Sequence, residues 1–410
     1  MDLAFGQDYE DFRVEVREFL ESNRDHWPRR GALGRPAEDA RKWQAMLIER
    51  GYTARTIPRE YGGYGGEADI LKSRIMAEEF NRVGAPGGLA GQGVSMLVPT
   101  LLEMGTEDQK QRWIEPTLNG EVLWCQGYSE PGAGSDLASL QTRAEEDGED
   151  FVINGQKIWT STAHEADMMF CLVRTEPDAP KHQGISYLLF PMSTPGIEVR
   201  PLQTMTGNAE FNEVFFTDVR VPQKDIVGRR GQGWLVANAT LKHERGMLGD
   251  PNTAGTRLAA IIKLMQEETV DGGSLMENPM LRERLLKLQG QVFAMQFNSL
   301  RLLTARAQKR KDAAMAGLIV KLQGCELNHQ LAALAIDALG ELGVLYQDSP
   351  HLRSRGGWQR SYMFDLGLII GGGTAQIQKN IIAERGLGMP REPKPAKPSP
   401  PQAAQAGSGS

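Results

Sequence analysis

The chain has 410 residues, of which 24% are charged and 40% hydrophobic, and its formal net charge is -6. This composition is typical of a soluble globular protein with two or three domains, and its scattered Lys and Arg residues argue against nucleic-acid binding. No apolar run approaches the roughly 20 residues of a membrane span. The three cysteines fit neither a disulfide framework nor a zinc site, so we expect a cytoplasmic protein without a bound metal.

Residues 1–122 are predicted to form an N-terminal helical domain. Its first two segments carry apolar residues at helical spacing, namely Phe12, Val16, Phe19 and Leu20, and then Trp43, Met46 and Leu47. Spacings of three and four place such residues on one helix face, which predicts two amphipathic helices. Glycine-rich loops such as "EYGGYGGEAD" interrupt the helical pattern.

Residues 123–233 are predicted to form a β-domain. In "FVINGQKIW" the pair Asn154-Gly155 stands between two β-prone runs, which predicts a hairpin turn, and "EEDGED" before it predicts another turn. Short apolar segments with polar breaks follow in "MMFCLVRT", "ISYLLFPM" and "NEVFFTDVRVP". Strands at this spacing favour a small antiparallel barrel or sandwich.

Residues 234–392 return to a helical pattern. One stripe steps by three and four through Leu281, Leu285, Leu288, Val292 and Met295. Such a stripe is typical of a helix that faces a bundle core, and a second long helical pattern covers about residues 313–342. Residues 393–410 are rich in Pro, Ala, Gly and Ser without residues that form a core, which predicts a disordered tail.

Two loops combine glycines with polar groups. "WCQGYSEPGAGSDLASL" (124–140) offers short hydroxyls and backbone N–H groups to a polar or anionic ligand. "LIIGGGTAQIQ" places Gly371, Gly372 and Gly373 between an apolar run and a predicted helix, which suggests close approach of the backbone to a ligand. Taken alone, each loop is equally compatible with an ordinary turn.

Four segments together resemble signatures of the acyl-CoA dehydrogenase family, in order and at the family's spacing. They are "YSEPGAGSD", "NGQKIWTS", "DVRVP" with "GQGW", and "GGTAQIQKNIIAERGLGMPRE". The resemblance implies an α+β fold with an N-terminal helical domain, a central antiparallel β-barrel and a C-terminal four-helix bundle. It also implies that FAD oxidises an acyl-CoA thioester to the trans-2-enoyl-CoA and that an electron-transfer flavoprotein receives the electrons.

The resemblance also implies a set of cofactor contacts. The matching positions are Tyr128, Ser129, Ser135, Trp159, Ser161, Thr374 and Gln376. Tyr128 and Ser129 would meet the isoalloxazine edge, and Ser135 would lie at the mouth shared with the substrate. Trp159 would cover one flavin face, although a core aromatic residue is the alternative, and Ser161 would bind near N5. Thr374 and Gln376 would meet the ADP part, where a helix N-terminus suits a pyrophosphate.

The position of the catalytic base departs from much of the family. Gly372 stands where many members carry the carboxylate, whereas some carry a glutamate before an arginine on the helix after the Gly-Trp motif. Glu244, followed by Arg245, occupies that second position, so Glu244 is the predicted base and Arg245 a predicted substrate contact. The Gly372 amide would still bind the thioester carbonyl. The alternative is that Glu244 is a solvated residue beside Lys242.

One family segment is missing, and this leaves other functions open. The chain has no Arg-x-x-Phe-Gly segment, whose arginine reaches the cofactor pyrophosphate across the dimer, and Asp337 replaces a common glutamine. The pattern is similar to bacterial members that act on bulky sterol-type acyl-CoAs, some as heteromers. We expect a homotetramer or a heterotetramer with a related subunit. The alternatives are a flavin oxidase or monooxygenase, and an inert partner subunit of a heteromer.

Overall fold

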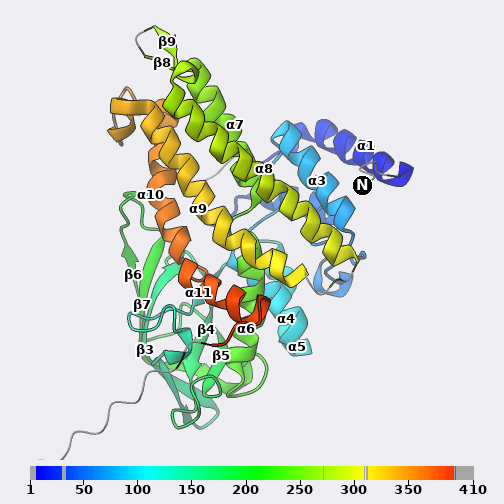
Figure 1. Ribbon diagram of the computed structural model, residues 1–410. Coiled ribbons are helices and arrows are strands. Elements are labelled where there is room, and N and C mark those ends of the chain that lie inside the picture. The colour runs from blue at the N-terminus through cyan, green and yellow to red at the C-terminus, as the bar shows by residue number, and fades with distance from the viewer. Residues whose placement is uncertain are drawn as a thin grey trace, which may run out of the picture.

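The computed structural model describes residues 6–29, 34–270, 272–308, 310, 313–391 and 393. It has an N-terminal helical domain, a curled central sheet and a set of long C-terminal helices (Figure 1). The predicted order of helices, strands and helices is therefore confirmed. The predicted disordered tail lies outside the described residues except for Pro393.

The helices of the N-terminal domain bury the apolar faces that their sequence spacing predicts. These helices are α1 (Gln7–Ser22), α2 (Glu38–Glu49), α3 (Ile70–Val83), α4 (Val98–Met104) and α5 (Glu107–Leu118). Phe12, Val16 and Leu20 of α1 share a core with Trp43 and Leu47 of α2. Phe19 and Met46 pack against the same core from its margin. The helical periodicity of this domain is confirmed at both segments.

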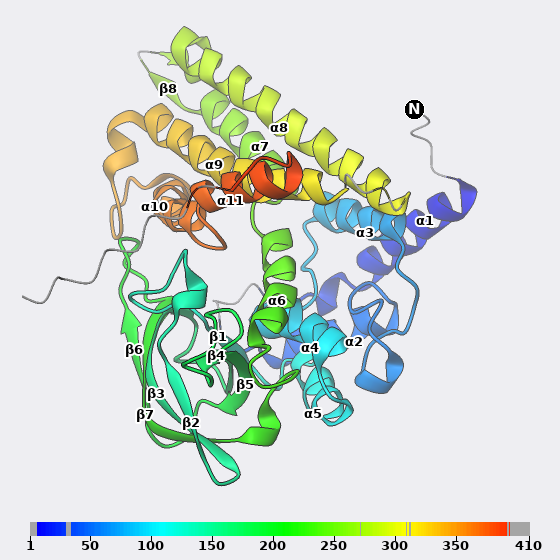
Figure 2. The ribbon, with the colours of Figure 1, turned by 60° about the horizontal axis from the view of Figure 1, so that its bottom comes forward.

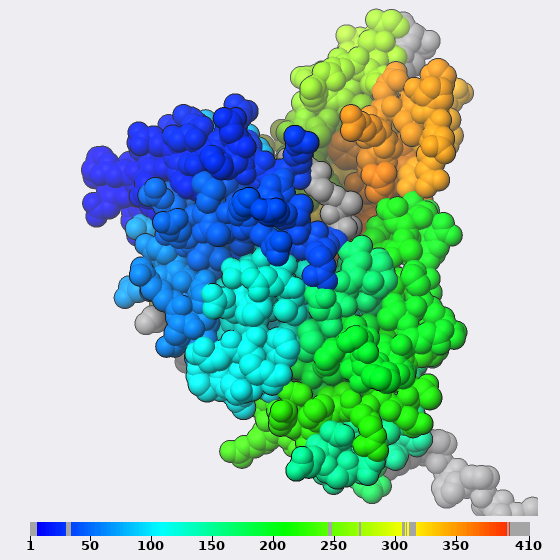
Figure 3. Space-filling model, turned by 180° about the vertical axis from the view of Figure 1, so that it is seen from behind, coloured from blue at the N-terminus to red at the C-terminus, as the bar shows by residue number. Residues whose placement is uncertain are grey.

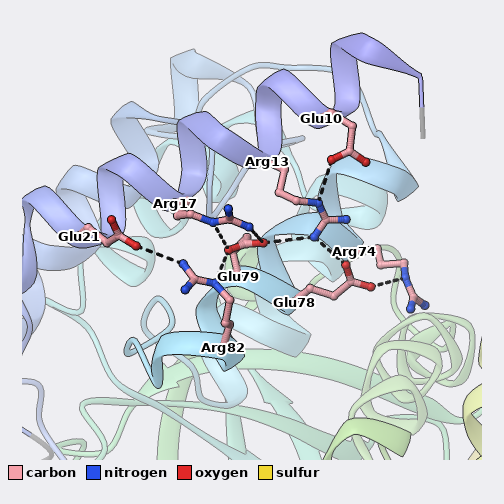
Figure 4. Close-up of polar contacts among 8 residues, drawn as sticks. All are labelled: Glu10, Arg13, Arg17, Glu21, Arg74, Glu78, Glu79 and Arg82. Atoms are coloured by element: carbon pink, nitrogen blue, oxygen red, sulfur yellow. Dashed lines mark hydrogen bonds and ion pairs between the residues drawn. The ribbon is translucent and has the colours of Figure 1, made fainter. Parts of the chain in front are cut away.

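A buried carboxylate joins α1 to α3 (Figure 4). Glu79 of α3 is 3% exposed and accepts hydrogen bonds from Arg13 and Arg17 of α1 and from Arg82 one turn away. Burial alone would raise the pKa of Glu79, but the arginine hydrogen bonds outweigh it and lower the pKa to about 2. The charged form of Glu79 is thus stabilised in the folded state.

Glu79→Gln is expected to weaken the packing of α1 on α3 by about 1–3 kcal/mol, because Arg13, Arg17 and Arg82 lose a shared charge. The folded pKa lies below the value of 4.5 for a free glutamate. The contribution of Glu79 to stability is therefore present above about pH 4.5 and lost as the pH falls toward 2. Hydrogen exchange of the α1 amides between pH 3 and 6 would measure both effects. Glu78→Gln, at a half-exposed neighbour, is the control and should change the exchange less.

The central sheet is open and mixed. Its strands are β1 (Trp124–Gly127), β2 (Arg143–Asp147), β3 (Asp150–Ser161), β4 (Met168–Arg174), β5 (Ile185–Pro191), β6 (Ile197–Leu202) and β7 (Phe211–Pro222). β4 pairs with β5 on one side and with β1 and β2 on the other, followed by β3, β7 and β6. The outer strands of the sheet are therefore β5 and β6, and the outer edge of β5 is bridged to Ile226 and Gln232. The sheet forms a half-barrel instead of the predicted barrel.

Two details of the predicted β-domain are wrong. The sheet is not purely antiparallel, because β1 and β4 run parallel. The alternation of apolar residues is the same in parallel and antiparallel strands, so it could not predict the direction of these strands. Asn154-Gly155 is not a hairpin turn, because β3 continues through it as a bulge. The Asn154 amide instead bonds Asp218 of β7, and a Cβ at Gly155 would lie 2.6 Å from Thr142 Oγ1. The predicted turn in "EEDGED" is confirmed as the β2–β3 hairpin.

The C-terminal part consists of long helices and a small β-ribbon. The elements are α6 (Gly233–Met247), α7 (Pro251–Glu267), β8 (Thr269–Val270), β9 (Gly273–Ser274), α8 (Pro279–Ala307), α9 (Ala313–Leu339), α10 (Gly357–Ile370) and α11 (Ala375–Ile381). The predicted stripe on α8 is confirmed, since Leu285, Leu288, Val292 and Met295 are buried against α7 and α9. The predicted four-helix bundle is not confirmed as a unit, because α6 packs on the sheet and α4 instead.

Helix α6 connects the parts of the molecule. Figure 2 shows it between the sheet and α4, with α9 and α11 above its C-terminal end. On the opposite face of the molecule, the N-terminal domain adjoins the sheet directly (Figure 3). The C-terminal end of α6 is therefore the place where these three parts of the chain meet.

Among the described helices, none is both long enough and apolar enough to span a membrane.

Candidate active site

The side chain of Glu244 faces the glycine loop that follows α10. A Cβ atom added at Gly372 would lie 3.3 Å from Glu244 Oε1 and would overlap Leu248 Cδ1. Gly372 has a φ of 64°, in the left-handed region that glycine adopts without strain. Its N–H has no hydrogen-bond acceptor within the described part of the chain. The structure thus places a carboxylate opposite an available backbone donor.

Buried hydroxyls fix α6 one turn before Glu244. Thr240 is fully buried, and its Oγ1 lies 3.0 Å from Thr100 Oγ1 of α4 and 3.4 Å from the hydroxyl of Tyr187. Lys242 on the same helix approaches Glu103 at 3.9 Å, so this cation is directed toward α4. Glu244 is half-buried rather than fully solvated. These contacts favour a defined position for the carboxylate.

Tyr128 lies beneath the same turn of α6. Its ring packs edge-on against Phe170 and Tyr187, with centroids 6.1 and 6.2 Å away. Its hydroxyl is buried and has no hydrogen-bond partner among the described residues. Burial is the main cause of the raised pKa of this phenol, and the negative charge of Glu244 contributes. The side chain of Tyr128 therefore faces the helix that carries Glu244, while its carbonyl remains in the loop after β1.

A buried ion pair holds that loop on the sheet. Lys157 of β3 is fully buried and donates to Glu130 Oε1 at 2.8 Å and to the Tyr128 carbonyl at 3.2 Å. Glu130 also accepts from the backbone N–H groups of Gln141 and Thr142, at 2.6 and 2.9 Å. Burial would raise the pKa of Glu130, but Lys157 and these hydrogen bonds lower it. The loop is therefore fixed at both ends by one charged pair.

Trp159 lies on the surface of the sheet in an uncommon backbone conformation. It is 58% exposed, its φ is 61°, and it lies within the irregular stretch of β3 between Lys157 and Thr160. A left-handed conformation in a bulky residue is strained by about 1–3 kcal/mol and is found mainly at functional sites. The alternative interpretation of Trp159 as a core residue is therefore wrong.

Aromatic rings connect this surface to the C-terminal helices. Trp159 packs edge-on against Phe211 of β7, whose ring stacks on Phe364 of α10 at 6.5 Å. Ser161 is half-buried and pairs with Phe211 across the two strands. The glycine loop begins directly after α10, the helix that carries Phe364.

The remaining predicted residues occupy different environments. Ser129 is half-buried, and its carbonyl accepts from the Ile158 N–H at 2.9 Å, next to Trp159. Thr374 is the N-cap of α11 and its hydroxyl accepts from the Ile377 N–H. Ser135 and Gln376 are exposed, and no described contact joins either to Glu244. Arg245 belongs to α6, but its side chain lies outside what the structure describes.

Sequence reasoning did not single out Glu130, Lys157 or Lys321. Glu130 and Lys157 lie inside the quoted motifs, and the signal for Lys157 was that it is the single charged residue of "NGQKIWTS". Lys321 is 2% exposed on α9 and lies near Gly373, far away in the sequence. A lysine in the apolar run "AGLIVKLQG" was the available signal, because a buried lysine is costly unless its ammonium group is bonded.

The comparisons with known proteins agree with this architecture. Residues 6–121, 125–219 and 231–387 match the models of the acyl-CoA dehydrogenase N-terminal, middle and C-terminal domains. The chain is 39% identical over 397 residues to acyl-CoA dehydrogenase IpdE1 of Mycobacterium tuberculosis, covering 95% of this chain and all of the relative.

Two solved structures cover this chain almost completely. The Tcur3481-Tcur3483 steroid ACAD has a TM-score of 0.79 and 31% identity, and the match covers 96% of this chain and all of that one. The ChsE4-ChsE5 complex of Mycobacterium tuberculosis has a TM-score of 0.78 and 30% identity at the same coverage. The chain belongs to the acyl-CoA dehydrogenase family, a family of flavoprotein oxidoreductases that act on acyl-CoA.

Proposed function

We propose that this protein catalyses the FAD-dependent α,β-dehydrogenation of an acyl-CoA thioester to the trans-2-enoyl-CoA, with Glu244 as the base. The observation that carries the proposal is the position of the Glu244 carboxylate opposite Gly372. An α-proton is acidic only while its thioester carbonyl is polarised, so the base and the carbonyl donor must lie near each other. Glu244 and the Gly372 N–H meet that requirement.

The residues around Trp159 fit a flavin. Trp159 offers an exposed ring, and the buried polar atoms Gln126 Nε2 and Thr160 Oγ1 have no hydrogen-bond partner among the described residues. When bound there, FAD would accept the β-hydrogen as hydride at N5. Ser129 and Ser161 would donate to the ring edge, and Tyr128 would contribute its backbone. Thr374 and Gln376 at the start of α11 would meet the ADP part.

The chain's own residues would carry the proton and the negative charge. The Gly372 N–H would donate to the thioester oxygen as charge develops there, and Glu244 would remove the α-proton. Both groups are positioned before the substrate enters, because Gly372 is in a fixed left-handed conformation and α6 is anchored through Thr240. Pre-positioned donors avoid reorganisation during the reaction. Ser135 and Arg245 remain proposed substrate contacts.

We propose a bulky, steroid-derived acyl group as the substrate class and a related subunit as the partner. The support is the similarity to a steroid ACAD and to the ChsE4-ChsE5 complex. Exposed apolar residues of α8, including Leu286, Phe293 and Phe297, would be buried in a tetramer or heterotetramer. An electron-transfer flavoprotein would reoxidise the flavin.

Anaerobic titration with a panel of acyl-CoAs tests this function. The holoprotein should lose its flavin absorbance with an acyl-CoA that carries α- and β-hydrogens, and it should bleach most completely with steroid-derived thioesters. The matched control is the 2,2-dimethyl analogue, which has no α-proton and should leave the flavin oxidised. A protein that takes up FAD but bleaches with no member of the panel, alone or with its co-expressed partner, contradicts the proposal.

Gly372→Ala is expected to slow flavin reduction at least about tenfold, because the new methyl would overlap Leu248 and force the loop to move. Alanine at a φ of 64° is also strained, by about 1 kcal/mol. Gly367→Ala in α10 is the matched control, since a Cβ there meets open space. Stopped-flow absorbance under anaerobic conditions would compare them. Equal rates for Gly372→Ala and the parent would exclude the proposed role of this amide.

A further inference from the structure

A buried ammonium group lies under the glycine loop. Lys321 of α9 is 2% exposed, and its Nζ donates to the carbonyls of Ile369 at 3.0 Å and Gly373 at 2.6 Å. Ile369 belongs to the last turn of α10, where carbonyls lack partners inside the helix. Lys321 therefore joins the end of α10 to the far side of the glycine loop, across Gly371 and Gly372.

A second buried side chain holds the carbonyl between these contacts. Gln378 of α11 is fully buried and donates from Nε2 to the Gly372 carbonyl at 3.2 Å. A Cβ at Gly373 would lie 2.6 Å from the same nitrogen, so the close approach of Gln378 requires glycine there. The carbonyls of Gly372 and Gly373 are thus both held by side-chain donors. The Gly372 N–H itself has no acceptor among the described residues.

We propose that Lys321 is a positioning residue for the Gly372 amide. This inference rests on the proposed function, because it concerns the donor in that reaction. By fixing the carbonyls of Ile369 and Gly373, Lys321 limits rotation of the peptide units between them. The Gly372 N–H then keeps one direction toward the space shared with Glu244.

The test compares Lys321→Met, Lys321→Arg and the control Lys379→Met in the purified holoprotein. Lys379 lies on the exposed face of α11, outside the proposed site. We expect Lys321→Met to lower the rate constant of flavin reduction about 10- to 100-fold, with a much smaller change in the acyl-CoA concentration for half-maximal rate. Lys321→Arg, which keeps the charge and the donors, should recover most of the rate. Lys379→Met should match the parent.

A spectroscopic measurement separates this role from a structural one. An acyl-CoA with a ¹³C thioester carbonyl is bound to the Glu244→Gln protein, which prevents turnover, and its infrared stretch is recorded with and without Lys321→Met. If Lys321→Met lets the Gly372 N–H turn away from the thioester oxygen, the stretching frequency should rise toward that in water. A frequency and a reduction rate in Lys321→Met equal to those of Lys379→Met would overturn the inference.

Different results would contradict the proposed function and the proposed role of Lys321. If Glu244→Gln is inactive and Lys321→Met is unaffected, the proposed function stands and this inference fails. If Glu244→Gln reduces flavin like the parent, the base assignment fails, and the carbonyl frequency of the unreactive 2,2-dimethyl analogue, recorded with and without Lys321→Met, decides the role of Lys321. Should Lys321→Met not fold, Gln378→Met removes the donor to the Gly372 carbonyl instead. An unchanged rate and frequency in that variant would then overturn the fixed-loop explanation.

Discussion

Glu244→Gln is expected to bind FAD and acyl-CoA like the parent protein but to lose flavin reduction. The amide has nearly the same shape as the carboxylate, so the packing of Glu244 and Leu248 against Gly372 is retained. It accepts no proton, and general-base catalysis contributes about 10²–10⁴-fold to such reactions. The rate constant of anaerobic bleaching should fall by at least that order, measured by stopped-flow absorbance with the best acyl-CoA of the panel.

Glu103→Gln is the matched control for that experiment. Glu103 is a half-exposed carboxylate on the neighbouring helix α4, and its contacts are Lys242 and His243 on the outer side of α6. Its loss should leave bleaching within about twofold of the parent, because surface ion pairs contribute little. If Glu244→Gln bleaches as fast as Glu103→Gln, another group is the base.

The helices were predictable from the sequence because their signal is local. The stripe on α8 and the length of α9 follow from apolar spacing, which the structure confirms with buried Leu285, Val292 and Met295. Strand direction was not predictable, because alternation is the same in parallel and antiparallel strands. The error at Asn154-Gly155 has a similar cause. The neighbours of this pair in the bulge are Asp218 of β7 and Thr142, which directly precedes β2, and both are distant from a local turn signal.

The candidate site was predictable only through the family resemblance. No local pattern connects Glu244 with Gly372, and only folding brings their helices together. The exposure and left-handed backbone of Trp159 also depend on the bulge in β3, which no residue type in "KIWTST" signals. Lys321 was missed because none of the motifs that carry the resemblance contains it. Its acceptors on Ile369 and Gly373 are backbone carbonyls, which no residue type in the sequence signals.

Lys157→Met is expected to destabilise the β-domain by about 3–5 kcal/mol. The variant leaves Glu130 as an uncompensated buried charge, which is the most costly way to break such a pair. The Tyr128 carbonyl loses its donor at the same time. The loop that begins at Tyr128 should therefore loosen, and FAD affinity should fall together with the unfolding temperature. Chemical denaturation and FAD fluorescence titration would measure the two effects.

Two further variants separate the effect of the buried charge from other effects. Lys181→Met removes the exposed lysine that pairs with Asp136 of the same loop, and we expect a change below about 1 kcal/mol. Glu130→Gln with Lys157→Met removes both charges and still leaves an oxygen for one of the two backbone N–H groups. The double variant should therefore be more stable than Lys157→Met alone. If both are destabilised equally, the loss is one of packing, and the charge of Glu130 is not its cause.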